Sequence, residues 1–343
     1  MVSLSEFDYP LPEELIAQQP VEPRDASRLL VLHRETGSVE HRTFSQVVDY
    51  LHPGDVLVIN DTRVIPARLR GEKEGTGGRV EVLVFQPLGT SPGGEVWKAL
   101  VRGRRVRQGT RVCFPGGITA TLRERVGEEW TVEFQTPRPL LSLLKEVGEV
   151  PIPPYIHLPV EDPEKYQTVY ARRNGSVAAP TAGRHFTPHL LSQITARGVT
   201  IVPVTLHIGP GTFLPVRVDE VTLHRIMPEA YEVSEEAAER INGARAAGGR
   251  VVAVGTSTVR TLESVADETG KVHPGKGWTD LFILPGYRFK VVDALVTNFH
   301  LPRSTLLMLV CAFAGREIVL RAYHEAIWER YRFGSFGDAM LIL

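Results

Sequence analysis

The stretch GDVLVINDTRVIPARL, residues 54–69, marks the place where the sequence changes from one kind of fold to another. Its first half contains a short apolar run at 56–59, which is typical of a strand buried on both faces of a sheet. Its second half begins a series of short strands joined by turn residues. The stretch therefore predicts a boundary between an α/β domain and an all-β module close to Val64.

The β module is predicted from six strand-like segments that follow one another without a helix between them. Glycine-rich links such as EGTGG and SPGG separate them and favour tight turns. The six segments cover 64–70, 79–85, 95–102, 110–114, 118–125 and 130–134, and a helix over 140–148 ends the module. Short strands in this arrangement are typical of a small antiparallel barrel.

Helix and strand alternate on both sides of this module. Before it we expect short helices over 11–20 and 45–51, two strands over 27–44 and a strand over 54–61. After it, helix and strand pairs cover 187–209 and 234–255, and a closing helix covers 317–331. The sequence therefore predicts an α/β domain with a mixed sheet, built from residues 1–63 and 150–343, that carries an inserted antiparallel six-stranded β-barrel, residues 64–149.

Length and composition agree with two folded domains. The chain has 343 residues, of which 43% are hydrophobic and 23% charged, as expected for a globular protein and not for a disordered or fibrous one. The formal net charge is −1, so an anionic partner has to be met by a local basic patch.

The two cysteines do not indicate a secreted protein, and the apolar runs do not indicate a membrane protein. Cys113 and Cys311 are far apart and lack a neighbouring cysteine, so we expect no disulfide framework and no structural zinc site. The N-terminus lacks the features of a signal peptide. The longest apolar run, residues 305–314, is about half of what a membrane crossing needs. We expect a cytoplasmic protein.

Four loops are candidate parts of an active site, because each follows an apolar strand and begins with polar or small residues. Ligands of α/β sheets commonly bind at such strand exits. The loops cover 60–69, 205–217, 251–264 and 293–315. The first combines Asp61, Thr62 and Arg63, for which a salt-bridged domain junction is the structural alternative.

The other three loops offer flexible backbone, hydroxyl groups and histidines. Gly209 and Gly211 allow a ligand to approach the backbone, although no Walker or dinucleotide motif is present. Thr256 and Ser257 open a helix with Arg260 expected in its first turn, an arrangement that suits a carboxylate or phosphate, or that is simply a capped helix with an exposed arginine. His207 and the Asn298–His300 pair suit base recognition or acid/base work, or serve the structure alone.

The stretch VAAPTAGRHFTPHLL, residues 177–191, admits several interpretations. A phosphate cradle needs more glycine than Gly183 supplies, and a metal site needs carboxylates at ligand spacing, although His185, His207 and His300 are candidates to converge. Small residues such as Ala182 instead predict close approach by a flat ligand, on which Phe186 stacks. With His185 titrating near neutral pH, we favour a purine-bearing substrate and an acid or base role for this histidine.

The segment VRGRRVRQGTR, residues 101–111, is a local basic patch inside the β module. It holds five arginines and no acid, and such a patch suits a nucleic-acid backbone. The alternative is a solvated surface whose charge is balanced by Glu124, Glu128 and Glu129.

Ten motifs, among them VAAPTAGRHF, VTLHIGPGTF, GTSTVR, VTNFHLPRSTLLM and YRFGSFGDAMLI, resemble in this order the S-adenosylmethionine:tRNA ribosyltransferase-isomerase family of the queuosine pathway. The resemblance runs from about Tyr9 to Ile342 and is weakest within the barrel. Arg184 departs from the leucine of the family motif AGLHF, which weighs against a direct catalytic role for this arginine.

The resemblance implies that the ribosyl part of S-adenosylmethionine is transferred and isomerised onto 7-aminomethyl-7-deazaguanine at the tRNA wobble position. The product is epoxyqueuosine in tRNA, and adenine and methionine are released. It also implies an α/β fold with an inserted barrel. We expect S-adenosylmethionine as a co-substrate, tRNA as the partner, no tightly bound cofactor or metal, and a monomer.

We assign site residues on this basis and from the chemistry that the reaction requires. His185, His207 and His300 are the candidate acid and base groups, with pKa values near working pH. The methionine carboxylate is placed at Thr256, Ser257 and Arg260, and adenine near Ala182 and Phe186. The predicted substrate-binding residues are Asp61, Thr62, Arg63, Thr181, Ala182, Phe186, Gly209, Gly211, Thr212, Thr256, Ser257, Arg260 and Asn298, and the predicted tRNA-binding residues are Arg102, Arg104, Arg105 and Arg107.

Two other classes of protein remain as alternatives at this stage. A non-catalytic tRNA-binding protein needs only the barrel and the arginine patch. A metal hydrolase would use the histidines as ligands, and its activity would be lost with a chelator.

Overall fold

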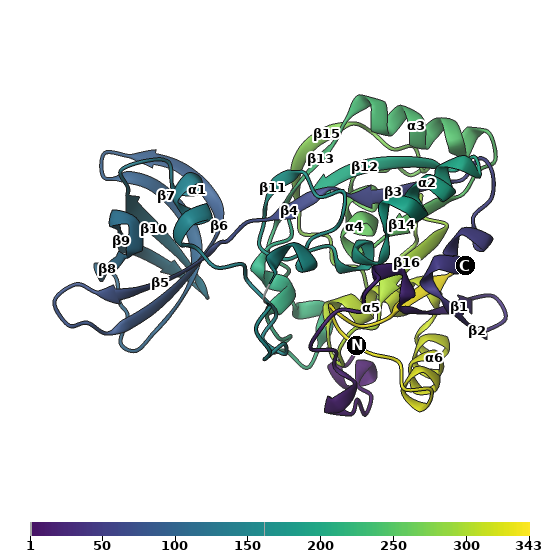
Figure 1. The fold of residues 1–343 in the computed structure, drawn as a ribbon, viewed down its shortest axis with the longest axis horizontal. Coiled ribbons are helices and arrows are strands. Elements are labelled where there is room, and N and C mark those ends of the chain that lie inside the picture. The colour runs from purple at the N-terminus through teal and green to yellow at the C-terminus, as the bar shows by residue number, and fades with distance from the viewer. Residues whose placement is uncertain (1, 161) are drawn as a thin grey trace. The chain divides into compact units, whose positions relative to one another are not determined.

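The computed structural model describes residues 2–160 and 162–343, and the chain divides into two compact units (Figure 1). The larger unit consists of the chain up to Arg63, Pro153–Arg173 and Ala179–Leu343. The smaller unit consists of Val64–Ile152 and Asn174–Ala178.

The larger unit is built on a mixed sheet of nine strands within the described residues, in the order β15-β13-β12-β3-β14-β16-β17-β1-β2. The strands are β1 Arg28–His33, β2 Ser38–Thr43, β3 Val56–Asn60, β12 Thr200–Leu206, β13 Glu229–Val233, β14 Val251–Val254, β15 Gly275–Thr279, β16 Ala294–Asn298 and β17 Ala339–Ile342. The four central strands β12, β3, β14 and β16 are parallel, whereas β13 and β17 run antiparallel beside them. The carboxyl ends of the four parallel strands therefore meet at one edge.

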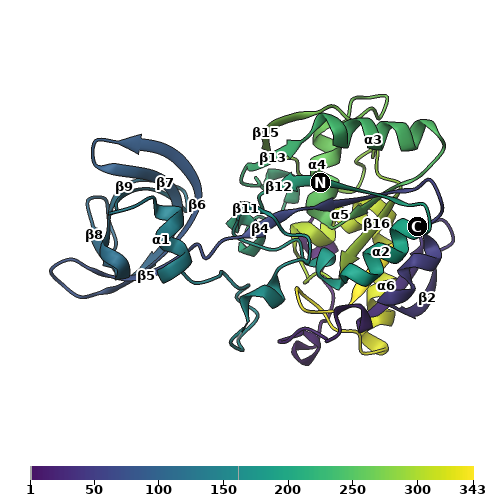
Figure 2. The same cartoon turned by 45° about the horizontal axis from the view of Figure 1, so that its top comes forward.

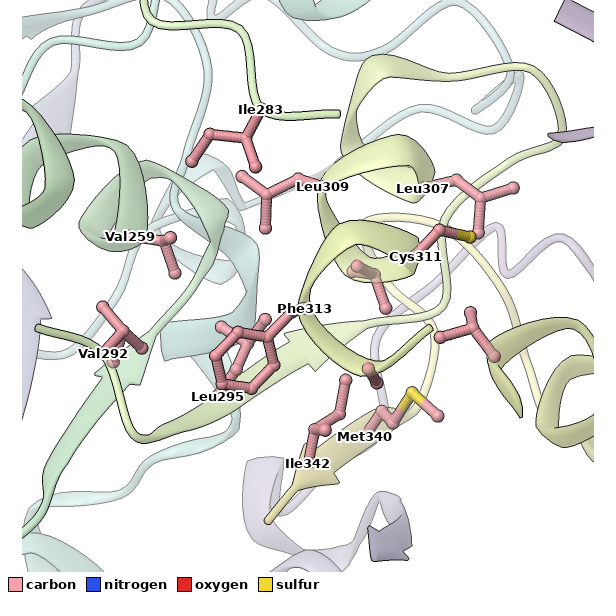
Figure 3. Close-up of a cluster of buried hydrophobic side chains, with 14 of the residues drawn as sticks. Val259, Ile283, Val292, Leu295, Leu307, Leu309, Cys311, Phe313, Met340 and Ile342 are labelled. Atoms are coloured by element: carbon pink, nitrogen blue, oxygen red, sulfur yellow. The ribbon is translucent and has the colours of Figure 1, made fainter. Parts of the chain in front are cut away.

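Helices cover both faces of this sheet, because its central strands are apolar on both sides. One face packs against α3 Glu235–Ala246, α4 Thr256–Val265, α5 Thr305–Ala314 and α6 Arg316–Trp328. The other packs against α2 Pro188–Ala196 and the 3-10 helix Phe44–Tyr50. Figure 3 shows the first core, in which Val259, Leu295 and Phe313 come from α4, β16 and α5. Consecutive residues of β16 enter opposite cores, Leu295 the first and Val296 the second.

The smaller unit is an antiparallel sheet of six strands that closes on itself, in the order β10-β7-β6-β5-β8-β9, with β10 also paired to β9 (Figure 2). The strands are β5 Arg68–Lys73, β6 Arg79–Ser91, β7 Gly94–Gly103, β8 Arg111–Phe114, β9 Ile118–Val126 and β10 Glu129–Gln135. Trp97, Phe114 and Trp130 fill the interior, and α1 Leu140–Val147 adds Leu140, Leu143 and Leu144 to the same core.

Of the two short helices expected near the N-terminus, the first is wrong and the second is present as a 3-10 helix. Residues 11–20 contain only the 3-10 turn Glu13–Leu15, because Ile16 and Ala17 pair with Phe333 through the backbone instead of continuing a helix. Residues 45–51 form the 3-10 helix Phe44–Tyr50. Pro66 separates β5 from β4 Thr62–Val64, which pairs with β11 Arg173–Ser176, so the segment expected as one strand over 64–70 is interrupted.

Candidate active site

The four loops selected from the sequence leave the same edge of the nine-stranded sheet. The parallel strands β12, β3, β14 and β16 are neighbours in that order, so the segments that begin at His207, Asp61, Gly255 and Phe299 start side by side. The edge is completed by the start of β1 and β17, which contribute Ser27 and Asp338. The four loops selected from the sequence therefore share one edge of the sheet.

Asn60 ties three of these loops together. Its amide nitrogen donates to the carbonyl of Leu206 and to the hydroxyl of Ser257, both at 3.0 Å. Its amide oxygen accepts the N–H groups of Thr62 at 3.1 Å and Leu206 at 3.0 Å. Because the side chain is fully buried and all of these groups are partnered, Asn60 is part of the scaffold. The sequence signal for this residue is that Asn60 is the one polar residue of β3 and stands at its end.

His185 is buried and bridges two polar side chains. Its Nδ1 lies 2.7 Å from Ser27 Oγ, and its Nε2 lies 3.1 Å from Asn298 Nδ2. Asn298 Oδ1 accepts a hydrogen bond from Thr181 Oγ1 at 2.9 Å, which orients the amide so that Nδ2 donates to His185. The hydrogen-bond network therefore assigns the neutral imidazole with its proton on Nδ1.

The expectation that His185 titrates near neutral pH is wrong. Burial, followed by repulsion from Arg184, lowers the pKa of His185 to about 3. The ring is also packed 5.0 Å, centroid to centroid, from Phe44. His185 therefore stays neutral throughout the ordinary working range of pH.

His300 lies on the opposite side of the sheet from His185. His185 contacts Asn298, whereas His300 Nε2 lies 2.7 Å from Thr297 Oγ1, and adjacent residues of a strand face opposite sides. The His300 backbone interacts with Tyr9 and Tyr323 in the core that contains α5 and α6. Burial lowers the pKa of His300 to about 3, against our expectation. The histidines thus do not converge, and no group of three His, Cys, Asp or Glu side chains in residues 2–160 and 162–343 is placed to hold a metal ion.

His207 lies at the edge shared by the four loops. It is half-buried at the end of β12, and its Nδ1 lies 2.8 Å from Thr62 Oγ1. Thr62 Oγ1 itself donates to the carbonyl of Arg173 at 3.4 Å, so it accepts the hydrogen from His207 Nδ1 and leaves Nε2 as the basic nitrogen. Burial lowers the pKa of His207, which favours the neutral form.

Asp61 and Arg63 are each held by other side chains. Asp61 is 2% exposed and accepts hydrogen bonds at 2.6 Å from Thr205 Oγ1 and Arg172 Nε. Arg63 pairs with Glu164. The charged groups of this loop therefore form ion pairs within the protein, as the structural alternative for this loop supposed.

Arg260 lies further along α4 than expected and is bound by groups of the protein. The helix begins after Gly255, so Arg260 lies in its second turn and not in the first as expected. Its guanidinium pairs with Glu229 and donates to the carbonyl of Leu281 at 2.9 Å. The other oxygen of Glu229 accepts the N–H of Gly209 at 2.7 Å. The sequence missed Glu229, which lies at the start of β13, a strand that was not predicted.

Ala182, which was predicted to lie near adenine, lies close to Gly255 at the start of α4. Gly255 has a φ of +88°, and a methyl group built there would lie 3.8 Å from Ala182 Cβ. Phe186, however, is fully buried and packs edge-on against Phe44, so it supports Ala182 from behind instead of presenting a ring face to a ligand. Gly211 and Thr212 lie in the 3-10 helix Pro210–Phe213.

Tyr170 and Thr168, which sequence reasoning missed, lie against this segment. Both hydroxyl groups are buried without a hydrogen-bond partner among the residues described. Gly183 is the reason that Tyr170 fits, because a methyl group at this position would lie 1.9 Å from the Tyr170 hydroxyl.

The basic patch is exposed on the smaller unit. Arg102, Arg104, Arg105 and Arg107 have exposed side chains around the end of β7, and Arg111, also exposed, pairs with Glu74 at 3.2 Å. Lys73 donates to the backbone carbonyls of Arg104 and Arg105 and so steadies the loop.

Comparisons with known proteins place the whole chain in one family. The sequence profile described as queuosine biosynthesis protein matches residues 4–342. The chain belongs to the queuosine biosynthesis protein family. A family member from Symbiobacterium thermophilum, named S-adenosylmethionine:tRNA ribosyltransferase-isomerase, is 58% identical over 344 residues, with 99% of each chain covered. A protein of the same name from Pelotomaculum thermopropionicum is 55% identical over 345 residues, with 100% of both chains covered.

The family is also represented among solved structures. The crystal structure named S-adenosylmethionine tRNA ribosyltransferase, from Thermotoga maritima, matches with a TM-score of 0.57 and 43% identity, covering 99% of this chain and 100% of the other. The resemblance of the sequence motifs to the S-adenosylmethionine:tRNA ribosyltransferase-isomerase family is therefore confirmed. In the described part of the chain no helix is long and apolar enough to span a membrane.

Proposed function

We propose that this chain is an S-adenosylmethionine:tRNA ribosyltransferase-isomerase. It transfers and isomerises the ribosyl part of S-adenosylmethionine onto 7-aminomethyl-7-deazaguanine at the tRNA wobble position, gives epoxyqueuosine-tRNA, and releases adenine and methionine. The observation that carries this proposal is the full-length similarity to relatives whose names state the activity. S-adenosylmethionine is then a co-substrate and tRNA the partner.

His207 is the candidate base in this proposal. The sulfonium of S-adenosylmethionine makes the C5′ hydrogens acidic, and a base that removes one of them generates an ylide. The neutral His207, with its proton held on Nδ1 by Thr62, offers Nε2 for this step. Burial lowers its pKa, so the basic form is present at neutral pH.

Asn298 and Thr181 are candidates to bind the substrate beside the small residues at Ala182 and Gly255. Thr181 and His185 together hold the Asn298 amide in one orientation. In this proposal His185 is a positioning residue, because its two ring nitrogens are engaged with Ser27 and Asn298. The opposite face of the sheet holds His300, which we assign to no chemical step.

The start of α4 is the candidate site for the methionine carboxylate. Thr256 and Ser257 follow Gly255 at the edge shared by the four loops, where free N–H groups of a helix favour an anion. Arg260 is assigned a different role: through Glu229 it positions the backbone at Gly209.

The tRNA backbone is proposed to contact the exposed arginines Arg102, Arg104, Arg105 and Arg107. A chain with a net charge of −1 needs such a local patch for a polyanion. The alternative of a tRNA-binding protein without catalysis has no support from the names of the relatives, which are those of enzymes.

The decisive experiment is a chromatographic assay for adenine and methionine. The protein is mixed with S-adenosylmethionine and tRNA that carries the precursor base, and unmodified tRNA serves as the substrate control. We expect both products in stoichiometric amounts in the reaction with precursor tRNA, and neither product in the reaction with unmodified tRNA. Absence of adenine from a folded protein with verified precursor tRNA would refute the activity.

The role of His207 is tested in the same assay with His207→Ala. We expect turnover to fall about 100-fold or more, as for loss of a general base. The matched control is His189→Ala, because His189 is exposed on α2 and belongs to no site described above. Near-normal turnover of His207→Ala would remove this histidine from the mechanism.

A further inference from the structure

Three arginines from separate parts of the larger unit surround a small pocket next to His185. Arg24 precedes β1, Arg184 lies in the 3-10 helix Thr181–His185, and Arg332 precedes β17. The pocket has a volume of about 10 Å³, and Ser27, His185 and Phe336 complete much of its wall. None of the described residues that line it is acidic.

Arg184 is a buried cation that forms no ion pair with a carboxylate of the described residues. Its side chain is 3% exposed, and it donates to the backbone carbonyls of Lys165 at 2.7 Å and Ser335 at 3.3 Å. The guanidinium carbon lies 4.7 Å from the centre of the Phe336 ring. Carbonyl groups and an aromatic face orient the guanidinium but leave its net charge uncompensated.

Arg332 supplies a donor whose interaction with the described residues is a long ion pair and not a hydrogen bond. Its Nη2 is buried and has no hydrogen-bond partner in residues 2–160 and 162–343. Asp338 Oδ1 lies 3.6 Å from Nη2, a distance at which it pairs with the charge without forming a hydrogen bond, and the same carboxylate accepts the backbone N–H groups of Arg28 and Arg332. A buried donor left without a partner is costly, so this nitrogen is suited to a ligand atom.

The surroundings of the pocket are cationic overall. Arg24 donates to the backbone carbonyls of Gln167 at 2.6 Å and Glu164 at 3.0 Å, which are neutral acceptors. Of the acids in the described residues, Asp338 pairs with Arg332, and Glu22 acts on the charge of Arg184. Burial, followed by repulsion from Arg24, lowers the pKa of Arg184 to about 9, so it remains charged at neutral pH. The three arginines together with these two acids leave an excess of positive charge around the pocket. The pocket has room for about one atom of the size of an oxygen.

We propose that Arg24, Arg184 and Arg332 form a binding site for one anionic oxygen of a phosphate group. The phosphate belongs either to free inorganic phosphate or to the backbone of a bound RNA, and only the second source rests on the proposed function. Guanidinium groups are the usual partners of phosphate, and the volume admits a single oxygen and not a whole nucleotide.

The first test uses inorganic phosphate alone. The melting temperature of the protein is measured at constant ionic strength while chloride is replaced by phosphate. We expect a saturable rise of at least about 2 °C, because a ligand that binds only the folded state stabilises it. The rise should disappear in Arg184→Leu, which keeps an apolar contact with Phe336, and in Arg332→Gln.

Arg330→Gln is the matched control, since Arg330 is an exposed arginine two residues from Arg332. It should show the same rise as the natural protein. An equal rise in all four proteins, or none in the natural protein, would overturn the proposal. Arg332→Gln keeps the test valid if Arg184→Leu fails to fold.

The second test distinguishes the two sources. Binding of precursor tRNA is measured with and without phosphate at constant ionic strength. Competition that is lost in Arg332→Gln assigns the site to an RNA phosphate, whereas independent binding of tRNA and phosphate assigns it to the free anion. The release of adenine is measured separately. A protein that lacks the proposed activity can therefore be distinguished from one that lacks the anion site.

Discussion

Arg260 and Glu229 form an ion pair that is almost completely removed from solvent, with side chains 11% and 5% exposed. Glu229 at the same time accepts the N–H of Gly209 at 2.7 Å, so the pair connects α4 to the loop that follows β12. This relationship changes the interpretation of Arg260. The side chain that we expected to bind a substrate carboxylate is satisfied by a carboxylate of the protein.

The first prediction concerns this pair. Arg260→Ala leaves Glu229 buried and unpaired, so we expect the free energy of unfolding to fall by about 3–5 kcal/mol, measured by urea denaturation. The double variant Arg260→Met, Glu229→Gln should recover part of this loss, because no uncompensated charge remains. If Arg260 served only to bind substrate, Arg260→Ala would lose activity at unchanged stability.

The second prediction concerns acid stability. The pKa values of His185 and His300 are lowered from 6.5 to about 3, so between these values the unfolded chain binds more protons than the folded one. The free energy of unfolding should therefore fall as the pH falls from 6.5 toward 3, by up to about 1.4 kcal/mol per pH unit for each histidine.

The same measurement separates the buried histidine from an exposed one. His185→Gln should reduce the slope of stability against pH in this range, since glutamine does not titrate. His189→Gln, at an exposed position on α2, should leave the slope unchanged. Equal slopes for the natural protein and His185→Gln would contradict the burial of this imidazole.

The third prediction concerns the contact of Gly183 with Tyr170. A methyl group at position 183 would lie 1.9 Å from the Tyr170 hydroxyl, so Gly183→Ala should lower the free energy of unfolding by about 1–3 kcal/mol. Tyr170→Phe alone should cost little, because the hydroxyl has no partner among the described residues. The combination should be more stable than Gly183→Ala alone, and failure of this rescue would locate the clash elsewhere.

The fourth prediction concerns the arginine patch. Replacing Arg102, Arg104, Arg105 and Arg107 by glutamine should weaken tRNA binding and reduce the dependence of the binding constant on salt concentration, since fewer counterions are released. Arg138→Gln is the control, because Arg138 is exposed on the same unit but paired with Glu146 at 2.8 Å. An unchanged salt dependence in the fourfold variant would place the tRNA contact on other residues.

Much of the fold was predictable because its signals are local. The apolar run at 56–59 is a buried central strand, and Thr187 and Pro188 begin α2 as expected, with Thr187 Oγ1 accepting the N–H of Leu190. The 3-10 turn Glu13–Leu15 was not predictable, because pairing of Ile16 with Phe333, which is distant in sequence, ends it.

The candidate site was predictable in place but not in detail. Strand exits containing Asp61, His207, Thr256 and Asn298 could be found from sequence, since each is an apolar run followed by polar residues. Glu229 could not, because it begins β13, a short antiparallel strand for which our sequence analysis gave no prediction. The partners of Arg260 therefore became visible only in the folded chain.

The sequence by itself determined the family, the alternation of helix and strand, and the insertion of a β module after Arg63, because motif order, hydrophobic period and turn residues are properties of neighbouring positions. Only the tertiary structure decided that His185 and His300 lie on opposite faces of β16 with lowered pKa values. It also decided that Arg184 is buried without a carboxylate partner among its described contacts. Desolvation and the choice of hydrogen-bond partner depend on residues that are far apart along the chain, and these are brought together only by folding.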